Sequence, residues 1–358
     1  MSNVMKIGTA AIIFLSAGTV ATLHAIKQGT TLAVVMTNDA MTNEIKVYDA
    51  QALLQTLSTQ GRGNAGGNAR GVRQYHGEIV AAVNNGSNSV AIFRRDGNGL
   101  KLEQVVGTTS APVSVDFGNS HMYVAGETTA DSFVLTHNHV GAHDGTVSLE
   151  LAGGGVPPGG STAQVGVLDR HQLLVTLKTD PTPGTVDVVA LDDDGAVTGS
   201  LTRVVSAPPG TLTPFGFSVS VDGTAVITLA HSSQDGLFRD GAFTTVINAG
   251  QTAPCWMTKA GKYFFTANTG SKTISRLVAT GNNIFVDGLV AATVVTGGAP
   301  SDIDSDHGVL GVIDHGAGQS HLSFFTYNAF GELTASGGAI TVGVPNANGV
   351  AIMAVDED

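Results

Sequence analysis

Histidine side chains gather at residues 137–145, in the segment HNHVGAHDG. His137 and His139 share one face if the chain is extended there, because side chains alternate along a strand, and His143 and Asp144 follow across a short loop. Three imidazoles and a carboxylate can hold Zn²⁺ or another divalent metal. The segment predicts either a metal site at His137, His139 and His143 or a solvated loop whose histidines tolerate exposure.

A second motif lies in the glycine-rich segment GRGNAGG, residues 61–67, which contains the pattern G-x-G-x-x-G. A dinucleotide site needs this pattern between a strand and the first turn of a helix. The following residues, NARGVRQYHG, have no helical periodicity. We therefore interpret the segment as a loop. The sequence contains no G-x-S-x-G, H-E-x-x-H or P-loop pattern.

The elements that must position such residues are short strands. The chain has 358 residues, of which 42% are hydrophobic and 13% charged, and its 47 glycines interrupt many short apolar runs. Such runs, separated by Gly, Asn, Asp and Ser, are typical of an all-β chain. The net charge is −12 with 17 Lys and Arg and no basic run, which argues against nucleic-acid binding. The single cysteine, Cys255, excludes an internal disulfide.

The N-terminal segment predicts export. A lone Lys6 precedes an uncharged, mostly apolar run from Ile7 to Ala21, and Thr19-Val20-Ala21 at its end offers small residues for cleavage. This pattern resembles a secretory signal peptide over residues 1–25, although an N-terminal strand or a retained anchor is the alternative. The run is too short and too weakly flanked for a stable membrane span. We expect one domain over residues 26–358, secreted or periplasmic and monomeric.

The strands belong to a repeat. Matching segments are GVRQYHGEIVAAVN, VSVDFGNSHMYVAG, VGVLDRHQLLVTLK, FGFSVSVDGTAVITLA, CWMTKAGKYFFTAN and SDIDSDHGVLGVID, with a partial copy NANGVAIMAV. Their starts are separated by 42, 52, 50, 40, 46 and 45 residues, a period typical of a β-propeller. We predict seven four-stranded antiparallel blades. The first copy lacks its inner strand and the last has only that strand, so the C-terminus should close the ring in the first blade.

The repeated segments, including PCWMTKAGKYFFTANTGSKTIS and APVSVDFGNSHMYVAG, resemble secreted members of the lactonase family of seven-bladed propellers. That family includes 6-phosphogluconolactonase and 3-carboxy-cis,cis-muconate lactonizing enzyme, and the likeness covers residues 30–355. It implies the fold and a lactonase-like activity, with no short catalytic motif to carry over. The chain departs from the family pattern in its third blade, where HNHVGAHDG reads as an insertion, and in the Ser-Pro-Asp-Gly turn, which most blades lack.

The repeat itself predicts a site, because inner-strand starts and second-strand ends meet at one end of a propeller channel. The substrate-binding candidates at these positions are Arg70, Lys178, Gln164, Trp256, Asn268 and Asp302. The candidate proton carriers are His231, Glu127 and His315. Arginine binds a carboxylate through two hydrogen bonds, and histidine transfers protons near neutral pH. Carboxylates around the channel, Asp39, Glu127, Asp302 and Asp314, could instead hold Ca²⁺ together with asparagines. Strand-end polar residues also often only satisfy turn backbones.

Two functions follow from these residues. The first is an enzyme that opens or closes a lactone, or cyclises or isomerises a related small carboxylic acid, by acid–base catalysis between Arg70 and His231 without an organic cofactor. The second is a secreted propeller that binds a small ligand or a protein partner without turnover, because a fold does not fix its function.

Overall fold

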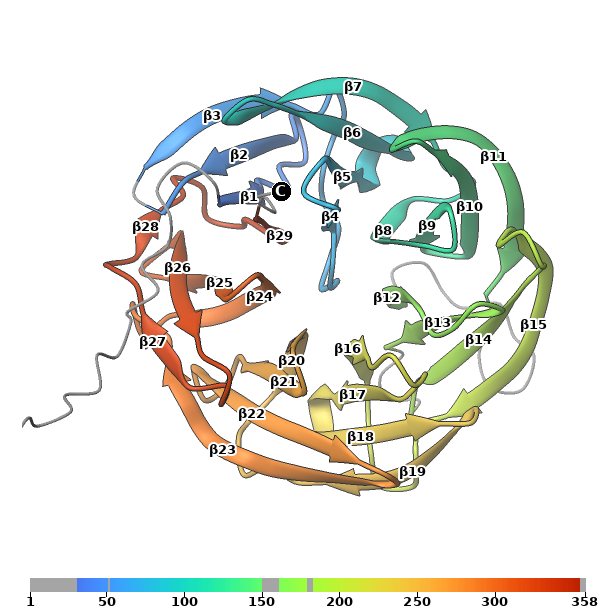
Figure 1. The fold of residues 1–358 in the computed structure, drawn as a ribbon, viewed down its shortest axis with the longest axis vertical. Coiled ribbons are helices and arrows are strands. Elements are labelled where there is room, and N and C mark those ends of the chain that lie inside the picture. Colours follow the sequence, from blue (N-terminus) through green and yellow to red (C-terminus); the bar gives the residue numbers. More distant parts are fainter. Residues whose placement is uncertain (1–30, 51, 150–160, 179–182, 355–358) are drawn as a thin grey trace, which may run out of the picture.

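Seven antiparallel sheets stand around a central axis in the computed structural model, which describes residues 31–50, 52–149, 161–178 and 183–354 (Figure 1). This arrangement confirms the seven-bladed all-β prediction. The predicted leader at residues 1–25 lies outside the described residues. Within the described ranges, no helix is both long enough and apolar enough to cross a membrane.

Each blade consists of four strands, ordered from the innermost strand at the axis to the outermost strand at the rim. Blade 7 has one short extra strand. Blade 1 contains β29 (Val350–Met353), β1 (Leu32–Met36), β2 (Glu44–Tyr48) and β3 (Leu53–Ser58). Blade 2 contains β4 (Val72–Tyr75), β5 (Ile79–Asn84), β6 (Ser89–Asp96) and β7 (Gly99–Gly107). Blade 3 contains β8 (Pro112–Gly118), β9 (His121–Gly126), β10 (Thr129–Thr136) and β11 (His139–Ser148).

The remaining blades follow in chain order. Blade 4 contains β12 (Thr162–Val167), β13 (Gln172–Leu177), β14 (Thr185–Leu191) and β15 (Val197–Ser206). Blade 5 contains β16 (Pro214–Val219), β17 (Ala225–Leu229), β18 (Gln234–Arg239) and β19 (Ala242–Ile247). Blade 6 contains β20 (Pro254–Ala260), β21 (Tyr263–Asn268), β22 (Thr273–Thr280) and β23 (Asn283–Thr293). Blade 7 contains β24 (Ala299–Asp306), β25 (Val309–Gly316), β26 (Gln319–Tyr327), β27 (Leu333–Ala335) and β28 (Ile340–Thr341). Two 3₁₀ turns follow the second strands of blades 2 and 5, η1 (Asn85–Ser87) and η2 (Ala230–Ser232).

The C-terminal strand closes the ring as the partial repeat predicted. β29 pairs antiparallel with β1, with Val34 opposite Ala351 and Leu32 opposite Met353. The inner strand of blade 1 therefore comes from the opposite end of the chain to the other three strands. This closure leaves no open sheet edge between the first and last blades.

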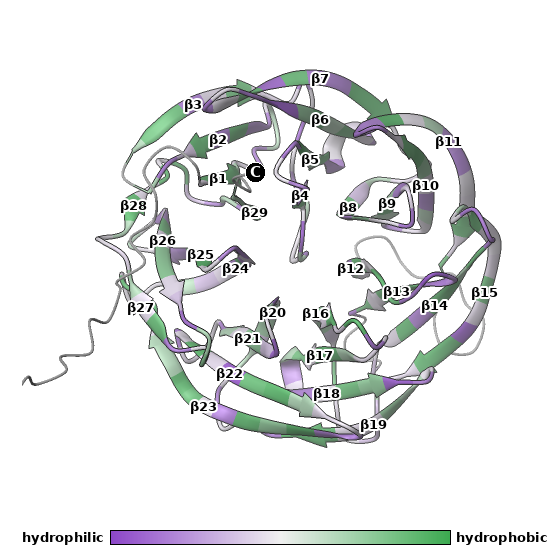
Figure 2. Ribbon diagram, viewed as in Figure 1, coloured by the Kyte–Doolittle hydropathy of each residue, from purple (hydrophilic) through white to green (hydrophobic). Residues whose placement is uncertain are grey.

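Burial explains the pattern of the repeat. The second strands are buried along their whole length in blades 1, 2 and 3, whereas the rim strand β3 alternates between exposed and half-buried residues. A second strand packs between two neighbouring blades, so both of its faces contact apolar side chains. Val226 of β17 in blade 5, for example, belongs to one apolar cluster with Met257 and Phe264 of blade 6. Hydrophobic and hydrophilic residues alternate along many of the outer strands (Figure 2).

Tight turns with glycine join the first and second strands of blades 2 and 7. His76 and Gly77 have φ values of 52° and 66°, and His307 and Gly308 have φ values of 40° and 85°. Positive φ at both central residues is the geometry of a two-residue hairpin turn that matches the twist of the flanking strands. These turns place the ends of β4 and β24 at the same end of the channel.

Candidate functional site: the central channel

Polar side chains join the innermost strands of neighbouring blades around the axis. Ser114 Oγ accepts a hydrogen bond from the Val165 amide at 3.1 Å, which joins blade 3 to blade 4. Gln164 bonds both backbone groups of Phe217 in blade 5, donating to the carbonyl at 2.8 Å and accepting from the amide at 2.9 Å. These contacts satisfy backbone groups at the inner edge of each sheet, which has no further strand to pair with. Gln164, predicted to bind substrate, here joins two blades.

A bulge recurs where the inner strands begin. In blades 3 to 7 the register shifts between the first residues of the inner strand, as between Pro112 and Ser114 or between Pro300 and Asp302. A bulge changes the direction of the side chains that follow it. The shifts therefore help to direct residues such as Asp302.

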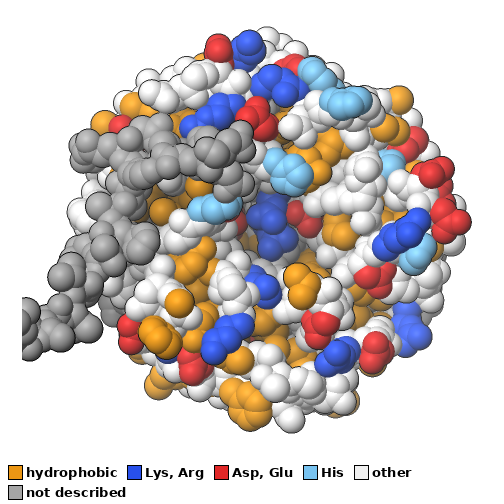
Figure 3. All heavy atoms as spheres, viewed as in Figure 1, with side chains coloured by type: hydrophobic (Ala, Val, Ile, Leu, Met, Phe, Trp, Pro, Cys, Tyr) orange, Lys and Arg blue, Asp and Glu red, His pale blue; other side chains and the backbone are white. Residues whose placement is uncertain are grey.

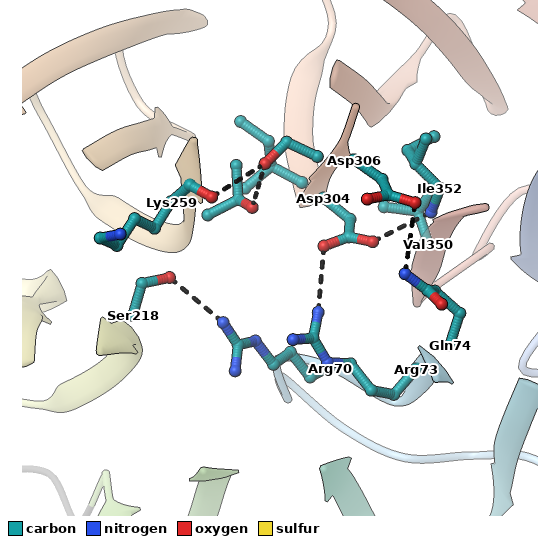
Figure 4. A network of polar contacts seen from close by, with 12 residues as sticks. Arg70, Arg73, Gln74, Ser218, Lys259, Asp304, Asp306, Val350 and Ile352 are labelled. Carbon is teal, nitrogen blue, oxygen red and sulfur yellow. Dashed lines mark hydrogen bonds and ion pairs between the residues drawn. The ribbon is translucent and has the colours of Figure 1, made fainter. Parts of the chain in front are cut away.

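Two arginines lie inside the channel. Arg70 precedes β4, and its Nη2 donates to Ser218 Oγ at 3.2 Å while Nη1 lies 3.8 Å from Asp116 Oδ2. Arg73 lies within β4 and bridges two blades, with Nε 2.9 Å from Asp116 Oδ1 and Nη1 3.2 Å from Asp304 Oδ1. Figure 4 shows Arg70 directed toward Ser218 and Arg73 toward Asp304. Two guanidinium groups thus come from one strand and its preceding residues.

Three carboxylates on β24 face the inner strand of blade 1. Asp302, Asp304 and Asp306 each accept a backbone N–H from β29 or the residue after it, from Val350 at 3.2 Å, Ile352 at 2.9 Å and Ala354 at 2.9 Å. Alternate residues of a strand point the same way, so the three form one ladder. The ladder joins the last blade to the first and supplies negative charge beside the arginines (Figure 4).

Burial and mutual attraction shift the acidity of these groups. Burial, followed by the charge of Arg73, lowers the pKa of Arg70 to about 10, although nearby aspartates oppose the change. For Arg73, burial disfavours the charge, but Asp116 and Asp304 outweigh it and raise the pKa. Burial raises the pKa of Asp302 to about 7 against two backbone N–H bonds, and it also raises the pKa of Asp304. Both arginines are thus charged at neutral pH, whereas Asp302 changes protonation there.

One end of the channel is open. Arg73, Gln74 and Tyr75 of β4 and Lys259 of β20 are all partly exposed near the ends of their inner strands. Figure 3 shows Lys and Arg side chains in the central hollow, with acidic side chains beside them and His side chains around it. A small anion can therefore approach the guanidinium groups through a polar opening.

Trp256 and Lys178, both predicted to bind substrate, contact the linker before β4. Trp256 Nε1 donates to the Asn68 carbonyl at 2.8 Å, and the indole is 9% exposed. Lys178 Nζ donates to the carbonyls of Gly66 and Gly67 at 2.9 and 2.6 Å. Burial lowers the pKa of Lys178 to about 8, opposed by the charge of Glu127. Trp256 therefore forms part of the channel wall, and Lys178 binds backbone.

The predicted proton carriers lie at the ends of the second strands. His231 is exposed in η2, where its Nδ1 lies 3.0 Å from Thr213 Oγ1, whereas Arg70 turns into the channel. Glu127 accepts a 3.5 Å bond from Asn85, and His315 Nδ1 lies 2.8 Å from the Pro345 carbonyl. Thr213 and Pro345 lie in loops between blades, and Asn85 lies in η1 of blade 2. Asn268, at the end of β21, donates to Thr273 and Ser275 of its own blade.

The histidine segment of blade 3 belongs to the outer hairpin of β10 and β11, so the loop that the sequence predicted there is wrong. His137 lies in the turn and the other two residues in β11, where His139 Nδ1 contacts Glu103 at 2.9 Å and His143 Nε2 contacts Thr146 Oγ1 at 2.8 Å. Across the described ranges, no group of three His, Cys, Asp or Glu is arranged to hold a metal ion. The three rings have different surroundings because two register shifts interrupt the pairing of β10 with β11. A metal site at His137, His139 and His143 stays a prediction.

Sequence reasoning missed Arg73, Asp116, Asp304 and Asp306. The segment SDIDSD places three carboxylates at alternate positions, which is the signal of one strand face and could have identified the ladder. Arg73 has no such signal, because its partners come from blades 3 and 7.

Comparisons with known proteins identify the fold. No family model matches the chain, and no curated protein matches it. A solved protein from Lactobacillus plantarum is similar with a TM-score of 0.65 at 17% identity, covering 90% of this chain and 99% of that one. The periplasmic gluconolactonase of Pseudomonas aeruginosa has a TM-score of 0.65 at 14% identity, covering 91% and 99%. A Bacteroides uniformis protein, provisionally named a 6-phosphogluconolactonase, has a TM-score of 0.63 at 14% identity, covering 90% and 99%. At these identities the likeness shows that the chain shares the fold of these proteins.

Proposed function

We propose that this protein is a lactonase-like hydrolase that binds a small lactone, or the hydroxy acid formed from it, in the central channel. The observation that carries the proposal is the pair of partly exposed guanidinium groups of Arg70 and Arg73 in the channel, near Asp302, whose pKa burial raises to about 7. Two structural neighbours carry lactonase names, which favours hydrolysis over cyclisation. We also propose that the protein acts in the periplasm or outside the cell, as the leader-like segment and the periplasmic neighbour suggest.

The proposed reaction needs one oxyanion site and one proton carrier. Water adds to the lactone carbonyl carbon, and its proton passes to the Asp302 carboxylate. Arg70 and Arg73 stabilise the negative oxygen that forms, as fixed donors in a buried site do most effectively. The ring C–O bond then breaks, and the leaving oxygen takes the proton from Asp302, which yields the open hydroxy acid. Lactone and water are consumed in equal amounts, and no organic cofactor is needed.

A non-catalytic binding protein is the second candidate. The observation that favours it is that Asp302, Asp304 and Asp116 already accept bonds from Val350, Ile352 and Val167. Such carboxylates can serve only to join blades, in which case the channel binds a ligand without changing it. The two candidates differ in whether a bound lactone is consumed.

The test is hydrolysis of aldonolactones by the purified protein. Its rate is measured between pH 5 and 9 from the protons that the product acid releases. We expect turnover, with activity that rises through a pH near 7 as Asp302 loses its proton. Arg70→Gly should lower kcat/KM by on the order of a hundredfold. Glycine suits the positive φ of 56° at this position, so the backbone is not strained by the change.

Asp302→Asn should lower kcat by on the order of a hundredfold or more, because the amide cannot take the proton, and the remaining activity should show no limb near pH 7. Arg203→Ala is the matched control, since Arg203 lies on the rim strand β15 and donates to the Gly241 carbonyl. Binding without hydrolysis of any lactone favours the second candidate. Full activity in Arg70→Gly contradicts the proposed site.

A further inference from the structure

The linker between blades 1 and 2 crosses the axis of the ring. Its residues 66–70, called the strap below, contact inner strands on opposite sides of the channel. Ala69 donates to the Ala163 carbonyl of blade 4 at 3.0 Å, and the Asn68 carbonyl accepts from Trp256 of blade 6 at 2.8 Å. The side chain of Asn68 donates to the Val113 carbonyl of blade 3 and accepts from Asn348, next to β29 of blade 1. The strap thus lies where these blades converge.

Lys178 fastens the strap from blade 4. Its Nζ donates to the carbonyls of Gly66 and Gly67, and to the Thr162 carbonyl of its own blade at 3.1 Å. An ammonium group has three N–H donors, so these three carbonyls use all of them. The same nitrogen lies 5.9 Å from the centre of the Phe215 ring. Lys178 is therefore committed to holding backbone.

Apolar packing completes this end of the channel. Ala69 belongs to one cluster with Ala163, Phe215, Ala230 and Trp256, which come from blades 4, 5 and 6. Asn68 is 0% exposed and Ala69 is 2% exposed. A chain that crosses the axis with these two residues buried leaves little room for a solute to pass.

The strap also positions Arg70, which is its last residue. The Arg70 carbonyl accepts a hydrogen bond from the Val115 amide at 3.0 Å, and its φ of 56° turns the side chain into the channel toward Ser218. A non-glycine residue in this region is held there by its surroundings at an energetic cost. The position of the guanidinium therefore depends on the bonds that anchor residues 66–69.

We propose that the strap makes the channel a one-ended pocket, which a small carboxylate or lactone enters only beside Arg73 and Lys259. In this arrangement Lys178 is a positioning residue, because it anchors the strap and through it Arg70. The ligand class rests on the proposed function, whereas closure by the strap does not.

The only tryptophan of the chain, Trp256, reports directly on closure because it donates to the strap. Lys178→Met keeps the length of the side chain and removes its donors. We expect this variant to show redder tryptophan emission and at least twofold stronger quenching by acrylamide than the wild type, while far-UV circular dichroism is unchanged. Lys178→Arg, which retains donors, should recover most of the protection.

Lys262→Met is the control for loss of a lysine, because Lys262 lies over the Tyr263 ring away from the strap. Unchanged quenching in a folded Lys178→Met overturns the anchoring role. Should Lys178→Met fail to fold, Asn68→Ser provides the second test of the same emission change.

The direction of access is tested by blocking each end in a Cys255→Ser background. Lys259→Cys places a thiol at the open end. Gly66→Cys places one on the exposed outer side of the strap, where an added Cβ meets no atom within 4 Å. Each is labelled with a bulky maleimide, and gluconate binding is measured by calorimetry. We expect the label at residue 259 to weaken binding at least tenfold and the label at residue 66 to leave it unchanged.

The reverse result, with loss of binding only from the strap side, overturns the one-ended pocket. If the unlabelled protein binds no gluconate and opens no lactone, the proposed function fails, and the tryptophan measurement still decides whether the strap is closed.

Discussion

Asp235 on β18 has a buried carboxylate, and among the residues that the structure describes neither of its oxygens has a hydrogen-bond partner. It pairs with Thr228, and the matching positions in blades 3, 4, 6 and 7 are occupied by Ala130, Val186, Ile274 and Leu322. One blade thus has an acid where the repeat otherwise has an apolar core residue. Burial raises the pKa of Asp235 to about 7, so the folded protein holds a proton that the unfolded chain releases near pH 4.

Replacement of this acid should stabilise the protein. Because the folded pKa is raised, the stability linked to Asp235 is fully present below pH 4 and is lost as the pH rises to about 7. Asp235→Val, which introduces the residue type that blade 4 has at Val186, should therefore raise the melting temperature more at pH 8 than at pH 5. At about 1.4 kcal/mol per pKa unit, the additional gain in the free energy of unfolding at pH 8 is up to a few kcal/mol. Thermal unfolding at both pH values measures this, with Asp193→Val in an exposed turn as control. A melting temperature of Asp235→Val below that of the wild type at pH 8 contradicts the prediction.

At the scale of the elements, β29 depends on two neighbours. It pairs with β1 on one side, and on the other the ladder of Asp302, Asp304 and Asp306 binds the N–H groups of Val350, Ile352 and Ala354. The pairing with β1 was predictable, because the first repeat lacks an inner strand and the last consists of one. The ladder contacts were not, because alternation along SDIDSD fixes a shared face but not the strand that the face meets.

Loss of β29 should open the ring. A chain that ends at Val344 leaves the edge of β1 unpaired and removes the N–H groups of Val350, Ile352 and Ala354 from the three carboxylates, and we expect its melting temperature to fall by 10 °C or more. Ile352→Pro, which removes the N–H that Asp304 accepts, should destabilise the full-length chain in the same direction, while Ile352→Val should have a small effect. Differential scanning calorimetry compares the three. A truncated chain as stable as the wild type is incompatible with closure by this strand.

At the scale of the whole molecule, apolar packing between blades surrounds a polar axis. The repeat predicted the number of blades and placed Arg70 and Asp302 near the axis, because each blade presents matching positions to it. It could not place the strap, whose contacts join residues up to 280 positions apart, as between Asn68 and Asn348. It also assigned proton transfer to His231, Glu127 and His315, which in the structure contact Thr213, Asn85 and Pro345 outside the strands. The sequence repeat predicts which residues each blade places near the axis. It does not predict which residues of different blades contact one another across the channel.

The central claim is that a small carboxylate binds between Arg70 and Arg73 inside the channel. A crystal structure of the protein soaked with gluconate, the open form of an aldonolactone, tests it most directly. We expect the carboxylate within hydrogen-bond distance of at least one guanidinium group, with the rest of the molecule directed toward Lys259 and away from the strap. Arg70→Gly crystals soaked in the same way should show weaker density or none. Gluconate bound at the second-strand ends beside His231, with an empty channel, would contradict the account.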